Sequence, residues 1–355
     1  MGMIALDRRA GPSAVMALAS PVLAVALTVL SGGVIFLAIG IDPGAGLWTY
    51  FLSPFADVYS RAELAVKAIP LALIGAGLAV SFRANVWNIG AAGQYTLGAI
   101  LSGGLALSLP EATGALWLLP YLAAGLLGGM LWAAIPALLR TRFQANEILV
   151  SLMLTYVATL LLDWLVRGPW RDPLGFGFPQ SADFAAGFVL PVILEGTRLH
   201  AGALLALLVC ALLAVMMSRT LRGFEISVIG QAPRAAAFAG FREARNVWFV
   251  LLLSGGLAGL AGAVEVSATI GQLQPDIAAG YGFTAIIVAF LGRLNPAGVL
   301  LGALVLAVSY IGGENAQILL KLPKNVTFVF QGMLLFFLLA CDTLIRYRLV
   351  WRRAA

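Results

Sequence analysis

The chain has 355 residues, of which 61% are hydrophobic and 11% are charged. A soluble protein carries about 25% charged residues, so the composition excludes a soluble globular protein and indicates an integral membrane protein. The net charge of +6 does not indicate a nucleic-acid partner, because the basic residues gather at the ends of apolar segments. Cys210 and Cys341 lie inside apolar stretches and His200 is the single histidine, so we expect no disulfide, metal or other cofactor.

In chain order, about ten apolar segments approach the roughly 20 residues that a helix needs to span a bilayer. They cover residues 14–40, 64–82, 90–108, 117–139, 147–166, 201–217, 247–270, 281–292, 297–312 and 326–345. The first is longer than the apolar core of about 7–15 residues in a signal peptide, so we expect an uncleaved anchor. The third begins with polar, glycine-rich sequence and is expected to be partly unwound. The eighth and ninth are short, and form either two short spans or a hairpin that enters the membrane and returns.

These segments predict an all-α, polytopic integral membrane protein with one transmembrane domain over residues 1–355. Most lysines and arginines fall on one side when the segments alternate, so both termini are expected in the cytoplasm. The loop at 218–246 is then cytoplasmic, and the loop at 167–200 is an ordered extracytoplasmic cap. Segments two to five and seven to ten would be inverted relative to each other, which is a common transporter plan. An inverted repeat is therefore a further expectation.

The sequence carries no motif for chemistry of its own. It contains no GxxxxGK[ST] phosphate loop and no HExxH, CxxC or GxSxG motif, so we expect no catalytic residue. A proton- or ion-driven carrier places ionisable residues deep in its spans, and the candidates here are Glu265 and Asp163. The energy for transport is therefore expected to come from a partner. The alternatives are a self-contained secondary carrier and a membrane-embedded enzyme.

One polar stretch, SVIGQAPRAAAFAGF at Ser227–Phe241, is too short to cross a membrane. Pro233 suits the first position of a helix, where its missing N–H would be unpaired anyway, and Gly240 suits the stop. So short a helix is marginal in isolation and needs a surface to pack against. Its alanine face with Phe238 would fit a groove in a soluble partner. The alternative is an ordinary polar loop.

Within this stretch, IGQAPRAAAFAGF resembles the coupling segment of ABC importer permeases of the ribose, nucleoside and branched-chain amino acid group. Ala232 stands where the family usually has Asn, which is a better helix N-cap. The sequence NVWNIGAAGQYTLGA at Asn85–Ala99 resembles the nucleoside and simple-sugar permeases. Ala145–Ala158, with Thr155 in place of the usual Asn, and Gly280–Gly298 resemble further motifs of that subgroup.

The resemblance implies a non-catalytic permease subunit of an ABC importer in the bacterial cytoplasmic (inner) membrane. Nucleosides are the preferred substrate class, with ribose-like simple sugars or branched-chain amino acids as alternatives. A cytoplasmic ATPase would supply energy, and a second permease, either a related chain or another copy, would complete the pathway. An extracytoplasmic binding protein would deliver the substrate.

The resemblance also implies that the short helix docks on the ATPase. The expected coupling residues are Gln231, Pro233, Arg234, Ala235, Ala236, Phe238 and Gly240. The expected pathway residues are Asn88, Gln94, Glu265 and Phe283.

Each pathway residue also has a structural alternative. Asn88 and Gln94 suit either a pathway wall or a tight turn, because glycine-rich backbone at membrane depth is tolerated where it is buried or lines a cavity. Glu265 suits either a hydrated cavity or the outer interface. Phe283 suits either base stacking or an interfacial anchor.

A polar pair precedes the fifth segment. Asn146 and Glu147 follow Arg140 and Arg142 at the start of a helix. A Glu in the first turn suits the helix dipole, so we expect the pair to cap the helix and form an ion pair.

Overall fold

The computed structural model describes residues 2–9, 11, 13–323 and 325–353. The chain forms two compact units. Unit 1 consists of Met1–Arg61 with Val308–Ala355, and unit 2 consists of Ala62–Ala307.

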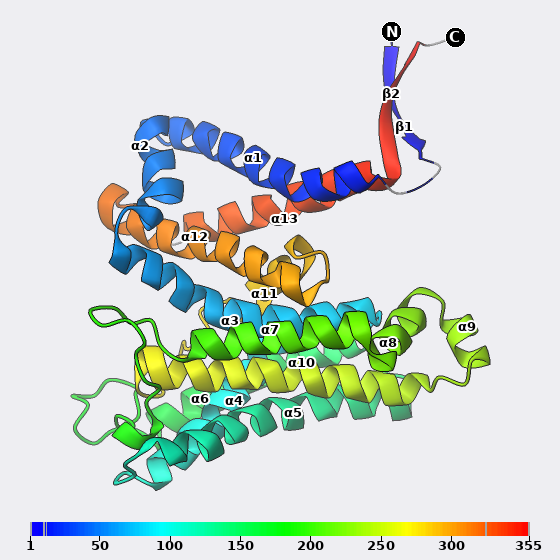
Figure 1. Ribbon diagram of the computed structural model, residues 1–355. Helices are drawn as coiled ribbons and strands as arrows, with labels where there is room; N and C mark the ends of the chain where they lie inside the picture. Colours follow the sequence, from blue (N-terminus) through cyan, green and yellow to red (C-terminus); the bar gives the residue numbers. More distant parts are fainter. Residues whose placement is uncertain (1, 10, 12, 324, 354–355) are drawn as a thin grey trace. The chain divides into compact units, whose positions relative to one another are not determined.

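Unit 1 brings together the two ends of the chain (Figure 1). Its elements are β1 (Gly2–Arg8), α1 (Ala14–Ala38), α2 (Pro43–Leu47), the π-helical turn η1 (Trp48–Leu52), the 3-10 turn η2 (Ser53–Phe55), the second half of α12 (Pro296–Leu320), α13 (Asn325–Arg346) and β2 (Tyr347–Arg353). Strand β1 pairs antiparallel with β2. Helices α1 and α13 pack against each other, next to this two-stranded sheet.

An aromatic cluster forms the core of unit 1. The ring of Tyr50 stacks on that of Phe330 with centroids 4.2 Å apart, and Phe36 lies 5.6 Å from Phe330. The Tyr50 hydroxyl shares a 2.8 Å hydrogen bond with Ser309, so its polar end is satisfied in the core. A Cβ at Gly312 would lie 1.8 Å from the Tyr50 carbonyl oxygen, so this close approach of α12 requires glycine.

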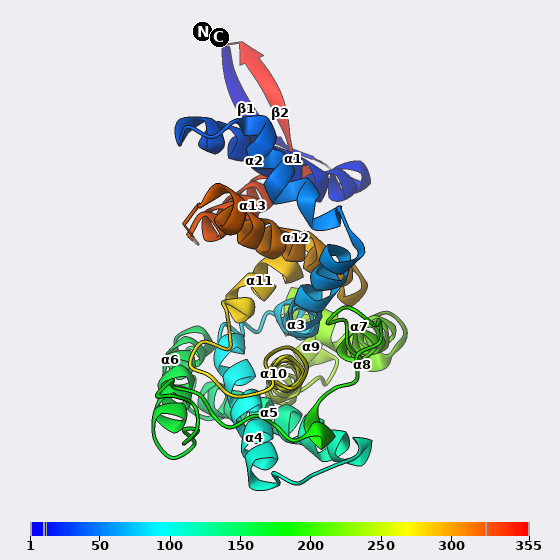
Figure 2. The ribbon, with the colours of Figure 1, turned by 90° about the vertical axis from the view of Figure 1, so that its left-hand side faces the viewer.

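Unit 2 is a bundle of helices. Its elements are α3 (Val58–Arg83), α4 (Ala91–Ser108), η3 (Ala115–Trp117), α5 (Leu118–Phe143), α6 (Glu147–Arg167), η4 (Ala186–Phe188), α7 (Gly202–Arg219), α8 (Leu221–Gln231), α9 (Pro233–Phe238), α10 (Glu243–Glu265), the π-helical turn η5 (Val266–Ile270), α11 (Tyr281–Leu291) and the first half of α12. Helix α10 packs against both α4 and α5, and Figure 2 shows it nearly end-on among its neighbours.

Glycines set the spacing of α4, α5 and α10. A Cβ at Gly98 of α4 would lie 2.2 Å from the Cα of Gly259 in α10. A Cβ at Gly129 of α5 would lie 2.0 Å from the carbonyl oxygen of Gly255. Such distances exclude any side chain, and small residues at helix contacts are typical of membrane bundles. Glycine therefore permits the close approach of α4, α5 and α10.

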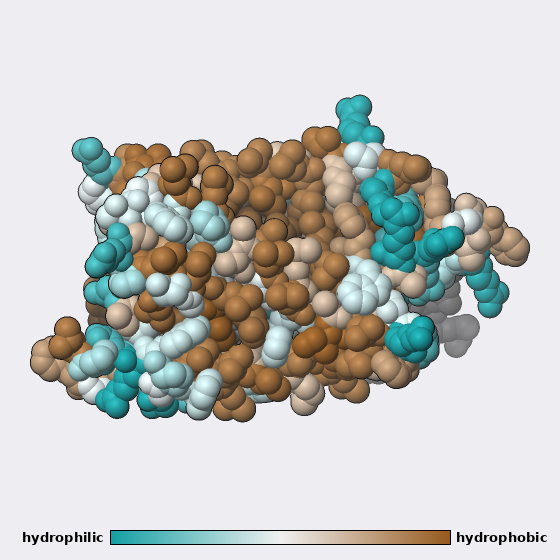
Figure 3. Space-filling view, turned by 90° about the horizontal axis from the view of Figure 1, so that it is seen from below, coloured by the Kyte–Doolittle hydropathy of each residue, from teal (hydrophilic) through white to brown (hydrophobic). Residues whose placement is uncertain are grey.

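Among the described residues, eight helices are long and apolar enough to cross a membrane. In Figure 3 hydrophobic residues fill the middle of the visible face, and hydrophilic residues gather toward its two ends. Helices α4 and α11 account for the other two predicted segments. The 11 residues of α11 rise only about 16 Å, roughly half of the hydrocarbon core, so α11 does not cross the membrane alone.

One expected segment is clearly longer in the structure. The ninth segment was expected to be short, over 297–312, whereas α12 runs on to Leu320. Its continuation, IGGENAQILL at 311–320, is interrupted by polar residues, which hid the helix from a count of apolar residues. The third segment agrees with its expected bounds, because α4 covers Ala91–Ser108, and the non-helical backbone lies before it, at 84–90.

The loop that carries α9 and the loop at 168–201 lie at opposite ends of unit 2 (Figure 1). This is the arrangement that alternating spans require for one inner and one outer loop.

Candidate functional site

A polar cavity opens at the end of unit 2 where α10 meets the loop at 168–201. Its volume is about 420 Å³. Ligand pockets in proteins typically measure about 300–1,000 Å³. We call this cavity the outer pocket, because the loop at 168–201 is predicted to be extracytoplasmic. It is lined by Lys67, Arg198, Glu265, Thr269, Ile270, Gln272, Gln274, Asp276, Ile277, Ala279 and Tyr281.

Glu265 is a buried carboxylate in the lining of the outer pocket. Its side chain is only 4% exposed. One carboxylate oxygen, Oε1, accepts a long 3.5 Å hydrogen bond from the hydroxyl of Tyr281. The other, Oε2, has no hydrogen-bond partner among the described residues. Buried polar atoms are nearly always paired, so this oxygen marks a place for water or a solute.

The backbone around the outer pocket departs from regular helix. Helix α10 passes into the π-helical turn η5 directly after Glu265. Ala279 adopts a positive φ of 41°, and Gly280 follows with 79°. Single π turns and left-handed non-glycine residues are both frequent at functional sites, because their strain persists only where the surroundings fix it.

The loop at 168–201 is fastened to the same segment by backbone hydrogen bonds. The N–H of Ser181 donates to the carbonyl of Leu273 at 2.9 Å, and the Leu273 N–H donates back to the Ser181 hydroxyl at 2.9 Å. The N–H of Phe184 donates to the carbonyl of Gly271 at 2.9 Å. The loop and the pocket segment are therefore a single ordered structure.

A buried hydroxyl and an ion pair complete this attachment. Ser267 in η5 donates to the carbonyl of Phe188 at 2.5 Å and accepts from the N–H of Leu190 at 3.1 Å. Arg198 forms a two-pronged ion pair with Glu63 of α3, in which Nε donates to Oε1 at 2.9 Å. Arg198 thereby presents its guanidinium at the wall of the outer pocket.

The histidine lies beside this ion pair. His200 is 1% exposed, and its Nδ1 accepts a 3.2 Å hydrogen bond from the N–H of Gly202. Burial lowers the pKa of His200 to about 4, although the Glu63 carboxylate acts in the opposite direction. The imidazole is therefore neutral at pH 7. Within the described residues, no group of His, Cys, Asp and Glu suited to a metal ion is found.

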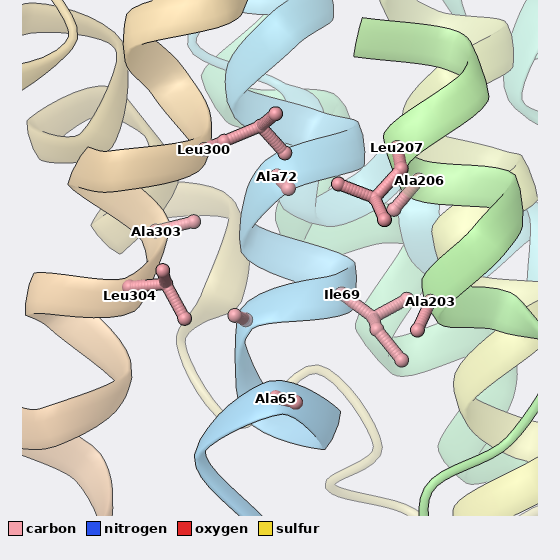
Figure 4. Close-up of a pocket in the computed structure, with 10 residues that line it drawn as sticks. Ala65, Ile69, Ala72, Ala203, Ala206, Leu207, Leu300, Ala303 and Leu304 are labelled. Atoms are coloured by element: carbon pink, nitrogen blue, oxygen red, sulfur yellow. The ribbon is translucent and has the colours of Figure 1, made fainter.

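A second cavity of unit 2 differs sharply in chemistry. It lies between α3, α7 and α12 and has a volume of about 150 Å³ (Figure 4). Its lining consists of Ala65, Ala68, Ile69, Ala72, Ala203, Ala206, Leu207, Leu300, Ala303 and Leu304. These side chains offer no hydrogen-bond donor or acceptor, so this cavity cannot orient a polar solute. The outer pocket is the better candidate for solute contact.

Two of the expected pathway residues lie in the interior of the bundle. The amide of Asn88 donates to Gln94 Oε1 at 2.7 Å, and Gln94 donates back to Asn88 Oδ1 at 2.9 Å. Asn88 also donates to the Ser254 hydroxyl of α10 at 3.0 Å. Asn88 is 0% exposed and Gln94 is 1% exposed. This closed arrangement favours a structural tie between α4 and α10, and a pathway role for the pair stays a prediction.

The aromatic residues of α11 divide between two environments. Phe283 is 45% exposed and is not part of the outer pocket lining. Tyr281, two residues earlier, is 1% exposed and lines the pocket. Of the four expected pathway residues, the structure therefore places Glu265 at the outer pocket.

At the other end of unit 2, α9 is a well-formed short helix. It begins at Pro233, and Gly240, with φ of 81°, follows its end. The N–H of Phe241 donates to the carbonyl of Ala236, and that of Gly240 donates to Ala237, both at 3.0 Å. This pair of bonds is the Schellman motif, in which glycine adopts the left-handed conformation without steric cost. The helix expected from Pro233 to Gly240 is present.

Most of α9 and its flanks is exposed, including Gln231, Pro233, Arg234, Ala235, Phe238 and Gly240. Phe238 is 95% exposed, so its own chain leaves the ring uncovered. Ala236 was expected among the residues that contact the ATPase, but it is 2% exposed and its side chain packs against its own chain. Ala236 therefore supports α9 from within and offers no surface to a partner.

Close contacts seat the α9 loop on the bundle. The ring of Phe241 packs edge-on against Phe224 of α8, with centroids 6.3 Å apart. A Cβ at Gly230 would lie 2.1 Å from the carbonyl oxygen of Arg83, so α8 touches the end of α3 through glycine. The α9 loop therefore contacts α8, and α8 in turn contacts α3.

The polar pair at the start of α6 has the structural role expected of it. Asn146 Oδ1 accepts from the N–H groups of Ile148 and Leu149, at 2.9 and 3.4 Å, and so caps the helix. Glu147 forms an ion pair with Arg140, whose guanidinium also lies 3.8 Å from Glu243 at the start of α10. The helix-capping and ion-pair interpretation is confirmed.

Comparison with known proteins decides the family. A family model described as "Branched-chain amino acid transport system / permease component" matches residues 60–339. The chain belongs to this permease family. It is an ABC transporter permease and a multi-pass protein of the cytoplasmic (inner) membrane, as the motif resemblance implied.

Curated relatives match this permease over nearly its full length. It is 35% identical to the glucose ABC transporter permease protein TsgB13 of Haloferax volcanii, over 97% of this chain and 92% of the relative. It is 29% identical to the guanosine ABC transporter permease protein NupP of Bacillus subtilis, over 89% of this chain and 91% of the relative. It is 26% identical to the nucleoside ABC transporter permease protein NupB of Lactococcus lactis, over 90% and 89%. The permease thus belongs to the nucleoside and sugar branch of ABC importers.

The sequence did not single out most of the outer pocket. Lys67, Arg198, Gln274 and Asp276 come from α3, the outer loop and the segment after η5. A local signal was present in GQLQPD at 271–276, where polar residues gather between two apolar segments.

Proposed function

We propose that this permease moves nucleosides into the cytoplasm as the membrane subunit of an ATP-driven importer. The nucleoside and guanosine permeases among its relatives support this substrate class. So does the stretch Asn85–Ala99, which resembles the nucleoside and simple-sugar subgroup. The permease itself performs no catalysis in this proposal, and a separate cytoplasmic ATPase hydrolyses ATP.

The exposure of α9 is the observation that supports coupling of this permease to an ATPase. A helix of about two turns is marginal alone, and α9 presents Phe238 and Ala235 away from its own chain. An amphipathic helix held out in this way fits an apolar groove of a soluble partner. We propose that the ATPase supplies this groove, with Gln231, Pro233, Arg234, Ala235, Phe238 and Gly240 at or beside the contact.

Further partners complete the importer. A second permease, either a related chain or another copy, would form the pathway together with this one. An extracytoplasmic binding protein would deliver the solute to the end that carries the outer pocket. We expect the pathway to hold the solute loosely, because transport requires binding weak enough to allow release.

Simple sugars are the second candidate substrate class. The relative with 35% identity is a glucose permease, which makes glucose or a similar sugar a specific alternative. Branched-chain amino acids are a weaker alternative and rest on the description of the family model.

Uptake by the complete assembly in proteoliposomes tests the substrate class. Labelled adenosine, uridine, glucose, ribose and leucine are supplied outside, each at the same concentration, with ATP available to the ATPase. We expect adenosine and uridine to accumulate at least tenfold faster than leucine. Uptake of glucose without nucleosides would move the substrate to the sugar class. Uptake of leucine alone would contradict both.

A further inference from the structure

We infer that the outer pocket binds the sugar ring of the solute through its adjacent hydroxyl groups, and that it does not read the base. This inference rests on the proposed function and adds which part of the solute this permease recognises. Nucleosides and simple sugars share a ring with adjacent hydroxyls, whereas only nucleosides carry a base. A pocket for the ring would therefore serve either substrate class.

The hydrogen-bonding groups of the pocket suit a polyol. Glu265 Oε2 is buried and has no hydrogen-bond partner among the described residues, so it is available to accept from a hydroxyl. Asp276 adds a second carboxylate, and Gln272 adds an amide that both donates and accepts. A hydroxyl group likewise donates and accepts, and two adjacent hydroxyls can donate to one carboxylate. Buried acceptors that lack a protein partner discriminate strongly against a solute that lacks the hydroxyl.

The aromatic content of the pocket does not suit a base. Among the described residues of the lining, Tyr281 is the one aromatic residue, and it is 1% exposed. The ammonium of Lys67 lies 6.0 Å from the centroid of its ring, and the ring of Tyr95 lies 6.2 Å away in a T-shaped contact. These contacts leave no broad ring face for a base, and bases gain much of their binding energy by stacking on aromatic rings.

The formal charges around the pocket suit a neutral solute. Lys67 and Arg198 are positive, whereas Glu265, Asp276 and the Arg198 partner Glu63 are negative. Two positive groups against three negative groups leave no excess of positive charge for a phosphate. We therefore expect nucleosides to enter and nucleoside monophosphates to be excluded.

Protection of an introduced cysteine tests the inference directly. Gln274→Cys places a thiol in the lining while Glu265 and Asp276 stay intact, and the native Cys210 and Cys341 are both buried. The variant is assembled with its ATPase and binding protein in proteoliposomes and labelled from outside with a small water-soluble thiol reagent. We expect adenosine and uridine to slow labelling by a similar factor of at least three. Adenine, 2′,3′-dideoxyadenosine and adenosine monophosphate should leave the labelling rate unchanged.

Leu174→Cys is the matched control, because Leu174 lies on the outer loop and is 83% exposed. Its labelling should not respond to any solute. Adding Glu265→Leu to Gln274→Cys should abolish protection by adenosine.

The inference is overturned if adenine or dideoxyadenosine protects Cys at position 274 as well as adenosine does, or if no solute protects it. In either case adenosine uptake by the assembly would leave the proposed function standing. Failure of the assembly to import any nucleoside or sugar would instead overturn the proposed function.

Discussion

Asn88 and Gln94 show what a buried polar pair contributes to this fold. Each amide satisfies the other, and Asn88 also reaches Ser254 on α10. The pair ties the non-helical stretch before α4 to the middle of the bundle. Its hydrogen bonds matter for stability because every member is desolvated.

We predict that Asn88→Ala destabilises the permease by about 1–3 kcal/mol, because it leaves the buried Gln94 amide without its partner. The measurement is the thermal unfolding midpoint in detergent. Thr96→Val is the matched control, since Thr96 is equally buried and donates only to Ala92 in its own helix. The double variant Asn88→Ala/Gln94→Ala should cost less than the sum of the single variants. Equal midpoints for Asn88→Ala and Thr96→Val would contradict this role.

Single residues were predictable from the sequence where their role is local. Asn146 and Glu147 precede a helix, so their capping and pairing follow from position alone. Glu265 stood out because it is a carboxylate in an apolar segment. Arg198 and Lys67 could not be assigned, because their place at the outer pocket depends on how distant segments pack. The burial of Ala236 depends in the same way on the seating of α9.

Helix α9 has its own start and stop residues, and it also has a surface that its own chain does not cover. Pro233 starts the helix, Gly240 ends it and Ala236 anchors it. Phe238 projects outward with 95% of its surface exposed. Replacing the Phe238 side chain should therefore change the free energy of unfolding only slightly.

We predict that Phe238→Asp weakens association with the ATPase and lowers ATP-dependent transport at least tenfold. The thermal midpoint should change little, because exposed substitutions usually alter stability by less than about 0.5 kcal/mol. Co-purification of the ATPase and uptake are measured on the same preparations. Leu174→Asp on the outer loop is the control, because it is also an exposed apolar residue and should leave ATPase association intact. Undiminished co-purification with Phe238→Asp would rule out docking through α9.

Most helices could be predicted because long apolar segments and local stop signals define them. The predicted segments correspond to helices α1, α3–α7 and α10–α13. The extension of α12 to Leu320 was missed because polar residues interrupt it. The extension packs within unit 1, as the close approach of Gly312 to Tyr50 shows, and such contacts between distant residues cannot be read from a local apolar pattern. The inverted repeat stays a prediction.

At the scale of the whole molecule, the features proposed for function belong to unit 2. That unit carries α9 at one end and the outer pocket at the other (Figure 1). Helix α10 begins beside the α9 loop and ends at Glu265. The glycine contacts bring the backbone of α10 against those of α4 and α5, so α10 has little room to move relative to these two helices. We propose that α10 links ATPase docking to the outer pocket.

The central claim is that this chain transports solute only when an ATPase partner drives it. The most direct measurement is adenosine uptake into proteoliposomes that contain this chain alone, or this chain with its ATPase, second permease and binding protein, with and without ATP. We predict uptake only by the complete assembly with ATP. Uptake of adenosine by this chain alone, without ATP, would contradict it.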